Sequence, residues 1–395
     1  MIYYEPFVYV GLIVFLGFYL IDKLYKKLPF NSLETYSLLI LFGVPLLSMI
    51  CSAIYWKQPP LYGFIAQKSW TFTIISFVIF YLLKTRKILL SDIRDVMLSI
   101  AWIQLVLYLI TQLVLDPKPY ADTIFAACSP AKGCTFLFDM MFFCFAILLY
   151  FFTFLRTNKT KYALYALIFF AYLFLVYQKR ALTLSLVATA GLYFLFNTDL
   201  KKKLYYSTII FGSIVILFGS IYLIRPDIIG KVEKMYGNVI DVLGGDSSGE
   251  ASADSRIKQV ITVGIFIAKN PSSIIFGNGR WYNNWDASPQ FNYGRFYASD
   301  VGIIGALLVY GLIGIILVQF EYILTILWFR KIKINKKNLF LQTCRYYMLF
   351  YWIRSLPTGG SYFEPGLSVP FIFMAIIFFY HYIENKTDSE FEIPD

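Results

Sequence analysis

The chain has 395 residues, of which 58% are hydrophobic and 15% charged, and its mean hydropathy is +0.63. A water-soluble domain cannot bury that much apolar surface, so the composition excludes one and predicts an all-α, polytopic membrane protein. The net charge of +11 fits basic loops beside anionic lipid headgroups. Because no RNA- or DNA-binding motif accompanies that charge, membrane lipids are expected partners and nucleic acid is not.

Apolar segments that could cross a bilayer as helices follow one another along the chain. A span needs about 20 residues, and this rule predicts about eleven spans. They are 6–21, 35–55, 69–83, 96–115, 135–155, 162–178, 181–198, 205–224, 301–329, 338–354 and 366–384. The first span has its lysines after it rather than before it, which favours a retained span over a cleaved signal peptide. We expect residues 1–395 to form a single integral membrane domain.

Lysines and arginines divide the loops between these spans into two sets. One set carries at least three of them in each loop, around Lys26, Arg86, Lys159, Lys202 and Lys333, whereas no alternate short loop carries more than two. Loops rich in basic residues stay in the cytoplasm. The N-terminus is therefore predicted outside, and the single histidine, His381, at the cytoplasmic end of the last span.

A short outer loop contains Cys128 and Cys134. In an oxidising compartment the two thiols could form a disulfide. No histidine lies nearby, so a metal site is not expected there. The sequence leaves a disulfide and two free thiols both open.

One outer loop, roughly 225–300, is much longer than the others, and long loops in compact proteins are usually functional. It holds a Gly- and Ser-rich linker, 244–250, and then a segment, 254–269, whose apolar residues recur every three or four positions. Asp254 is a suitable N-cap, and Pro271 lies just past the end of the segment. We expect an amphipathic helix on the outer membrane surface.

Basic residues on the outer side are exceptions to the charge rule. Lys179 and Arg180 lie between two apolar spans with almost no loop. Adjacent cations there are costly unless they are paired or face an aqueous cavity, which indicates a functional site. The alternative is a tight turn whose side chains reach lipid phosphates.

Two more outer arginines lie in the long loop. Arg256 is in the first turn of the predicted helix, where the helix dipole disfavours a cation, so an anion or Asp254 is expected to hold it. Arg280 follows a Gly-Asn-Gly sequence at 277–279, and glycines let a backbone approach a ligand closely. The alternative at this position is an ordinary turn. A nucleotide role is not expected, because the segment is predicted outside and lacks a preceding strand.

Aromatic residues surround a further arginine, Arg295. Tyr293 and Tyr297 flank it, and such rings suit either an interfacial aromatic belt or a surface on which a sugar stacks. Arg354, at the end of a span, is either a side chain that snorkels to the interface or a further glycan contact.

Several arginines converging from separate outer segments would suit a diphosphate, because the guanidinium binds phosphate oxygens at two points and stays charged. Two outer carboxylates complement them. Asp300 starts the span after the long loop, where an N-cap role is the alternative, and Glu364 lies in an irregular outer loop. Either carboxylate could accept a proton from a sugar hydroxyl. In the following span Gly305, Gly311 and Gly314 are expected to let helices pack closely.

Several short motifs within about 160–330 resemble those of the O-antigen polymerase and ligase superfamily. They are the Asn-Pro at 270–271 with the Phe-Gly-Asn-Gly at 276–279, the Ser-Asp-Val-Gly at 299–302 and the Tyr-Gly-Leu-Ile-Gly at 310–314. In that superfamily a span also ends near a Ser-Arg-like pair. Here Lys179 stands where Ser is common, before Arg180.

The resemblance implies a GT-C-like glycosyltransferase of a bacterial inner membrane, with its active site facing the periplasm. Such enzymes act on undecaprenyl-diphosphate-linked glycans without a nucleotide sugar, and neither a cofactor nor a metal is expected. The resemblance also allows a chain-length-regulating membrane protein as a further partner. The residues implied to hold the donor diphosphate are Lys179, Arg180, Arg256, Arg280 and Arg295.

The expected function is polymerisation of lipid-linked repeat units into O-antigen or a related surface polysaccharide. The ligase branch of the superfamily uses an outer-side histidine, and the predicted cytoplasmic position of His381 favours the polymerase branch, called Wzy. The alternatives are a ligase that transfers glycan to lipid A-core and a non-enzymatic polysaccharide transporter or flippase. Against transport, the sequence shows no obvious inverted repeat.

Overall fold

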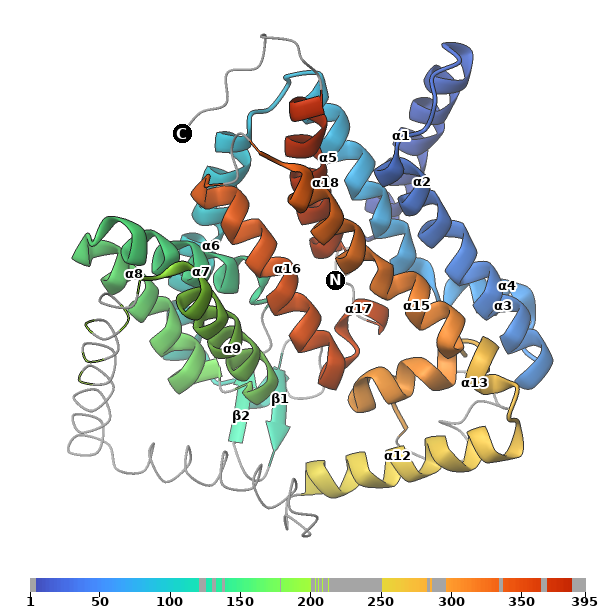
Figure 1. The fold of residues 1–395 in the computed structure, drawn as a ribbon. Coiled ribbons are helices and arrows are strands. Elements are labelled where there is room, and N and C mark those ends of the chain that lie inside the picture. The colour runs from blue at the N-terminus through green and yellow to red at the C-terminus, as the bar shows by residue number, and fades with distance from the viewer. Residues whose placement is uncertain are drawn as a thin grey trace. The chain divides into compact units, whose positions relative to one another are not determined.

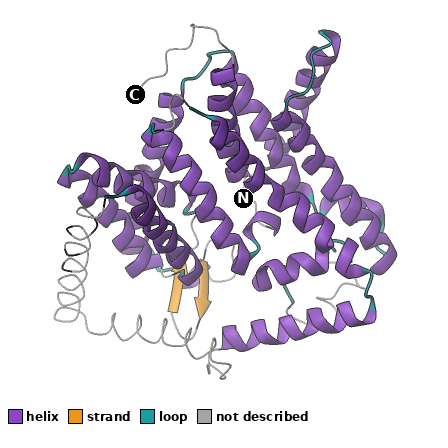
Figure 2. Cartoon of the chain, viewed as in Figure 1, coloured by secondary structure: helices purple, strands orange, loops and turns teal. Residues whose placement is uncertain are grey.

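The computed structural model describes residues 5–120, 126–129, 133–136, 139–177, 179–199, 203, 205, 208, 212, 251–282, 285, 296–333, 337–363 and 368–385. Within these ranges helices dominate, and the strands form one short hairpin (Figure 2). The chain divides into two compact units, Met1–Leu90 with Ser255–Asp395 and Ser91–Asp254, which are treated one at a time below.

The first unit contains most of the helices (Figure 1). In chain order they are α1 (Glu5–Tyr25), α2 (Ser32–Leu38), the π-helical η1 (Leu39–Gly43), α3 (Val44–Tyr55), α4 (Pro60–Ile65), the 3₁₀ helix η2 (Lys68–Ile74), α5 (Ile75–Lys84), α12 (Ala251–Lys269), α13 (Ser273–Phe276), η5 (Ala298–Val301), α15 (Gly302–Lys331), α16 (Leu339–Thr358), α17 (Gly360–Phe363) and α18 (Ser368–Asn385).

In the second unit the described residues form four longer helices, two short helical elements and the two strands of the hairpin. Its elements are α6 (Leu90–Val114), η3 (Lys118–Tyr120), β1 (Ala126–Ser129), β2 (Gly133–Phe136), α7 (Met141–Thr157), α8 (Thr160–Ala171), the π-helical η4 (Tyr172–Tyr177) and α9 (Arg180–Asn197). Helix α7 packs against α8 and α9. In the antiparallel hairpin Cys128 stands opposite Cys134, and Cys134 is disulfide-bonded, so the free-thiol alternative is wrong.

Six helical segments among the described residues are long and apolar enough to cross a membrane. They are Pro6–Tyr25, Ser32–Tyr55, Leu90–Gln112, Thr160–Tyr177, Arg180–Asn197 and Ala298–Lys331. This confirms a polytopic helical membrane protein. Shorter apolar helices, Met141–Thr157 and Val369–Ile383, coincide with two more of the predicted spans. The count of about eleven stays a prediction, and most of the predicted span 205–224 falls outside the described residues.

Helix α18 forms the centre of the first unit. It packs against α5, α15 and α16, and its middle is buried on all sides, as expected for a helix that is apolar all round. The ring of Phe378 lies 5.3 Å from that of Phe80 and 4.9 Å from that of Trp328. These contacts tie α5 and α15 to α18.

Helix α12 confirms the helix predicted within the long loop. It buries Gln259 and Val263 against the rest of the unit and exposes Ile257, Ile261 and Ile265. These three residues recur every four positions, so they form a single apolar stripe that no other described element covers. Such a stripe suits the predicted place on a membrane surface.

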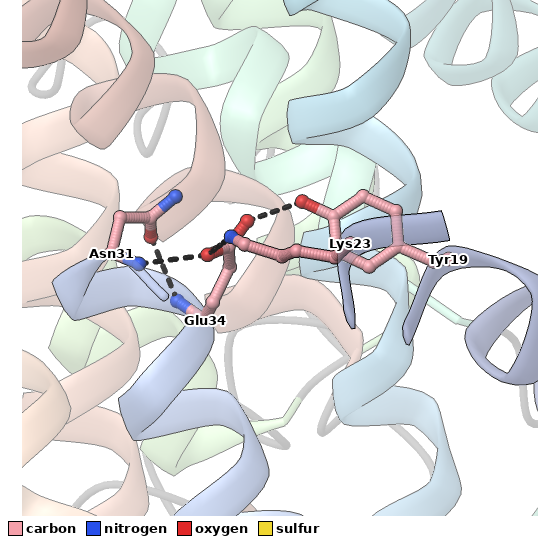
Figure 3. A network of polar contacts seen from close by, with 4 residues as sticks. All are labelled: Tyr19, Lys23, Asn31 and Glu34. Atoms are coloured by element: carbon pink, nitrogen blue, oxygen red, sulfur yellow. Dashed lines mark hydrogen bonds and ion pairs between the residues drawn. The ribbon is translucent and has the colours of Figure 1, made fainter. Parts of the chain in front are cut away.

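A buried ion pair joins α1 to the start of α2 (Figure 3). The Glu34 carboxylate accepts hydrogen bonds from Lys23 Nζ and from the Tyr19 hydroxyl. Asn31 fixes the carboxylate in a capping box, since its amide N donates to Glu34 Oε2 (2.7 Å) and its side chain accepts from the Glu34 amide (2.9 Å). The exposed fractions of the Lys23 and Glu34 side chains are 10% and 1%.

Removing only the cation should leave the Glu34 carboxylate buried without its charge partner. We expect Lys23→Met to lower the free energy of unfolding by about 3–5 kcal/mol. Combining it with Glu34→Gln should restore much of the loss. Thermal unfolding of the purified protein in detergent measures both effects. Lys26→Met, which breaks the exposed pair with Asp22, is the control and should cost less than about 1 kcal/mol. Equal losses for the two lysine variants would contradict a buried pair.

Candidate functional site at the glycine turn

The Gly-Asn-Gly turn predicted to approach a ligand instead lies against the backbone of two helices. The Asn278 amide donates to the Leu308 carbonyl (2.7 Å), and the Gly279 amide donates to the Val309 carbonyl (2.9 Å). Both acceptors belong to the first part of α15. The turn is thus joined to α15 by main-chain hydrogen bonds.

Helix α15 is interrupted where the turn meets it. Gly311 has φ 62° and ψ −175°, a conformation essentially restricted to glycine, and α15 changes direction there (Figure 1). Gly277 has a similar conformation, with φ 76° and ψ 174°. A Cβ on Gly311 would lie 2.4 Å from the Gly277 N, and one on Gly277 would lie 2.3 Å from the Val309 O. At each glycine, the backbone of the other segment therefore occupies the space that a Cβ would take.

The other side of the turn contacts α3. A Cβ on Gly279 would lie 2.2 Å from the Ser52 N. The next amide, that of Arg280, donates to the Ser48 Oγ (2.8 Å). Trp56 Nε1 donates to the Gly279 carbonyl (3.0 Å), and Gln58 Nε2 donates to the Arg280 carbonyl (3.3 Å). The backbone on both sides of Arg280 is therefore held by side chains of α3 and of the loop that follows it.

This arrangement directs the half-buried Arg280 side chain toward α17. Arg280 Nη2 donates to the Phe363 carbonyl (3.4 Å), and the guanidinium carbon lies 5.6 Å from the centroid of the Phe363 ring. Arg280 Nη1 is buried and has no hydrogen-bond partner. Neither polar atom of the Asn278 side chain has a partner, although the residue is only 1% exposed. Buried polar groups are nearly always paired, so these atoms mark a place where a polar ligand or water can bind.

The structure describes the remaining predicted diphosphate residues only in part. Arg256 is exposed on α12. Lys179 is exposed at the start of α9, with its Nζ 5.6 Å from the centroid of the Tyr177 ring, and Arg180 is half-buried as the first residue of that helix. Both belong to the second unit, so their convergence with Arg280 stays a prediction. Arg295 lies outside the described residues.

The predicted carboxylates and glycan contacts are placed in part. Asp300 is exposed in η5, immediately before α15, and Tyr297 is 39% exposed, with its amide donating to Gln259 Oε1 of α12 (3.3 Å). The guanidinium carbon of the half-buried Arg354 lies 5.7 Å from the centroid of the Tyr351 ring. Glu364 and Tyr293 lie outside the described residues.

Four residues of this site were not predicted from the sequence: Ser48, Trp56, Gln58 and Phe363. Ser48 and Ser52 recur four positions apart in an apolar span, a spacing that places two small polar groups on one helix face. That signal was available but is unspecific. Gln58 and Phe363 have no local signal. No protein-family model matches the chain, and no curated protein matches it either.

Adding a methyl group at Gly311 should break the contact between the turn and α15. We expect Gly311→Ala to lower the free energy of unfolding by at least about 1–3 kcal/mol, the cost of that backbone conformation without glycine, and by more because of the clash with the turn. Gly264→Ala is the matched control, since a Cβ there meets nothing within 4 Å on an exposed face of α12. It should stabilise the helix by about 0.8–1.0 kcal/mol. Thermal unfolding of both variants measures the difference, and equal changes would argue against the contact.

Proposed function

We propose that the protein polymerises glycan repeat units linked to undecaprenyl diphosphate, with Arg280 holding the diphosphate of the donor. The observation that carries this proposal is Arg280. Its backbone is held by α3, and its guanidinium contacts α17 and still has a buried nitrogen without a partner. Guanidinium nitrogens bind phosphate oxygens at two points. The resemblance of the 270–314 motifs to O-antigen polymerases supports the same assignment, as does the disulfide in a loop predicted to lie outside.

In this reaction a hydroxyl of the acceptor repeat unit attacks the anomeric carbon of the growing donor chain. The bond between that carbon and the diphosphate oxygen breaks, and undecaprenyl diphosphate leaves with the bonding electrons. Arg280 stabilises the negative charge that develops on the leaving oxygen, which is electrostatic stabilisation of the transition state. A carboxylate takes the proton of the attacking hydroxyl.

We propose Glu364 rather than Asp300 as that carboxylate, on the ground of sequence adjacency alone. The guanidinium of Arg280 contacts the carbonyl of Phe363, and Glu364 is the next residue. Asp300 has no comparable link to Arg280 among the described contacts.

Arg280→Ala should abolish long polymer while the protein still reaches the membrane. Loss of one such donor lowers the rate about 10²–10³-fold, equivalent to about 2.7–4 kcal/mol. The measurement is the length distribution of surface glycan in cells whose chromosomal copy is deleted and replaced by each variant. Lys269→Ala, which removes an exposed cation at the end of α12, is the control and should leave the distribution unchanged. Arg280→Lys should restore the glycan length only in part, because lysine offers a point charge rather than the planar guanidinium. Unchanged long polymer in Arg280→Ala would exclude the assigned role.

If Arg180 and Arg280 hold one diphosphate, their effects on the rate should not add. Each single alanine variant is expected to shorten the glycan severely, and the double variant should be little worse than either, because groups acting on one charge are coupled. In vitro elongation of lipid-linked repeats by the purified variants measures the three rates. Independent, multiplicative losses would place the two arginines at separate sites.

The deletion strain separates this proposal from its alternatives. Loss of a polymerase should leave lipid A-core carrying one repeat, whereas loss of a ligase should leave glycan on undecaprenyl diphosphate. Elongation by the purified protein without an energy source would exclude pure transport.

A further inference from the structure

A carboxyl group is buried in the membrane-spanning part of α15, at a position that none of the roles above uses. Glu321 is only 2% exposed. It lies halfway between the break at Gly311 and the end of the helix at Lys331, a stretch about 30 Å long at 1.5 Å per residue. The hydrocarbon core of a bilayer is about as thick, so Glu321 lies close to its middle if this stretch crosses the core.

Hydroxyl groups surround this carboxyl. The Tyr322 and Ser361 hydroxyls share a hydrogen bond of 2.7 Å, and both lie beside the Glu321 carboxyl. The Oε1 atom of Glu321 is buried and has no hydrogen-bond partner. Carboxylate and hydroxyl oxygens from α15 and α17 thus meet at one point, and one carboxylate oxygen is still available.

No basic side chain neutralises Glu321 among the described residues. Glu321 takes no part in the ion pairs Lys23–Glu34, Lys26–Asp22 and Arg94–Asp95. On α16, Arg345 lies over the rings of Phe329 and Tyr346, and Arg354 lies over the ring of Tyr351.

The titratable groups near Glu321 are tyrosines whose hydroxyls are already paired. The Tyr36 hydroxyl of α2 donates to the Leu317 carbonyl (2.9 Å), and the Tyr351 hydroxyl donates to the Gly360 carbonyl (3.3 Å). The Tyr362 hydroxyl accepts from the Gln319 amide. None of these groups supplies a positive charge.

An ionised carboxylate without a partner is very costly in a hydrocarbon layer, so a bound cation must balance it. We propose that Glu321, with the Tyr322 and Ser361 hydroxyls, forms an intramembrane site for one monovalent cation, a proton or a sodium ion. One carboxylate balances one positive charge, whereas a divalent ion would leave one positive charge without a counter-charge. Oxygen ligands are those that hard cations prefer.

The site is connected to Arg280 through α17. Ser361 contacts Glu321, and the carbonyl of Phe363, two residues further along the same short helix, accepts from Arg280. Occupancy of the cation site should therefore affect how α17 presents Phe363 to Arg280. This coupling rests on the proposed function, whereas the cation site does not.

The melting temperature of the full-length protein in detergent tests the site. Wild type and Glu321→Gln are compared across NaCl concentrations, with choline chloride holding the ionic strength constant, and across pH. A sodium site predicts a rise of several degrees with NaCl that choline chloride does not reproduce and that Glu321→Gln lacks. A proton site predicts no specific effect of sodium. It predicts instead that wild type gains stability relative to Glu321→Gln as the pH falls, because the folded state binds the extra proton.

If the melting temperatures of wild type and Glu321→Gln change by the same amount with NaCl and with pH, the cation site is overturned. Glu34→Gln, which removes a buried carboxylate that already has its lysine, is the control and should keep the cation dependence of wild type. If Glu321→Gln does not fold, Ser361→Ala keeps the carboxyl and removes one oxygen, so its cation midpoint should weaken several-fold. An unchanged midpoint in Ser361→Ala would also overturn the site.

Glycan length in the same variants keeps the two proposals separate. Loss of the cation dependence in Glu321→Gln with normal polymer would leave the site in place and exclude the coupling through α17. Normal polymer in Arg280→Ala would exclude the polymerase assignment without affecting the cation site.

Discussion

The interruption of α15 at Gly311 is the constraint on which the candidate site depends. A break inside a membrane-spanning helix frees backbone carbonyls that lipid cannot satisfy. Here the amides of Asn278 and Gly279 satisfy those of Leu308 and Val309, so the break and the glycine turn stabilise each other. Arg280 is the next residue along the chain. Its position is therefore a direct consequence of how the broken helix is capped.

Local sequence patterns predicted the helices around this site but not the contacts between them. The apolar lengths and the three- and four-residue spacing of 254–269 were enough to predict the helices that cross the membrane and α12, because both depend on residues close in sequence. Gly311 was expected only to allow close helix packing. Its role in the break could not be predicted, since it depends on Gly277, more than 30 residues earlier, and on the space that neither Cβ occupies.

Charged residues show the same limit. The orientation rule placed Arg180, Arg256 and Arg280 on one side of the membrane but carried no information about distance, and the structure exposes Arg256 on α12 while burying part of Arg280. Glu321 was not predicted as a site at all. A single acid in an apolar run has no partner in sequence, because the hydroxyl of Ser361 reaches it only after α16 and α17 have folded back against α15.

Helix α17 connects the Glu321 carboxyl with the Arg280 guanidinium. It is a four-residue turn packed against α15 and α16, and irregular backbone at membrane depth is tolerated where it is buried in protein or lines a cavity. Ser361 of α17 lies beside the Glu321 carboxyl of α15. The Phe363 carbonyl of α17 accepts a hydrogen bond from the Arg280 guanidinium. A turn this short cannot shift at one end without shifting at the other. A change of charge on Glu321 that moved Ser361 would therefore also move the Phe363 carbonyl to which Arg280 donates.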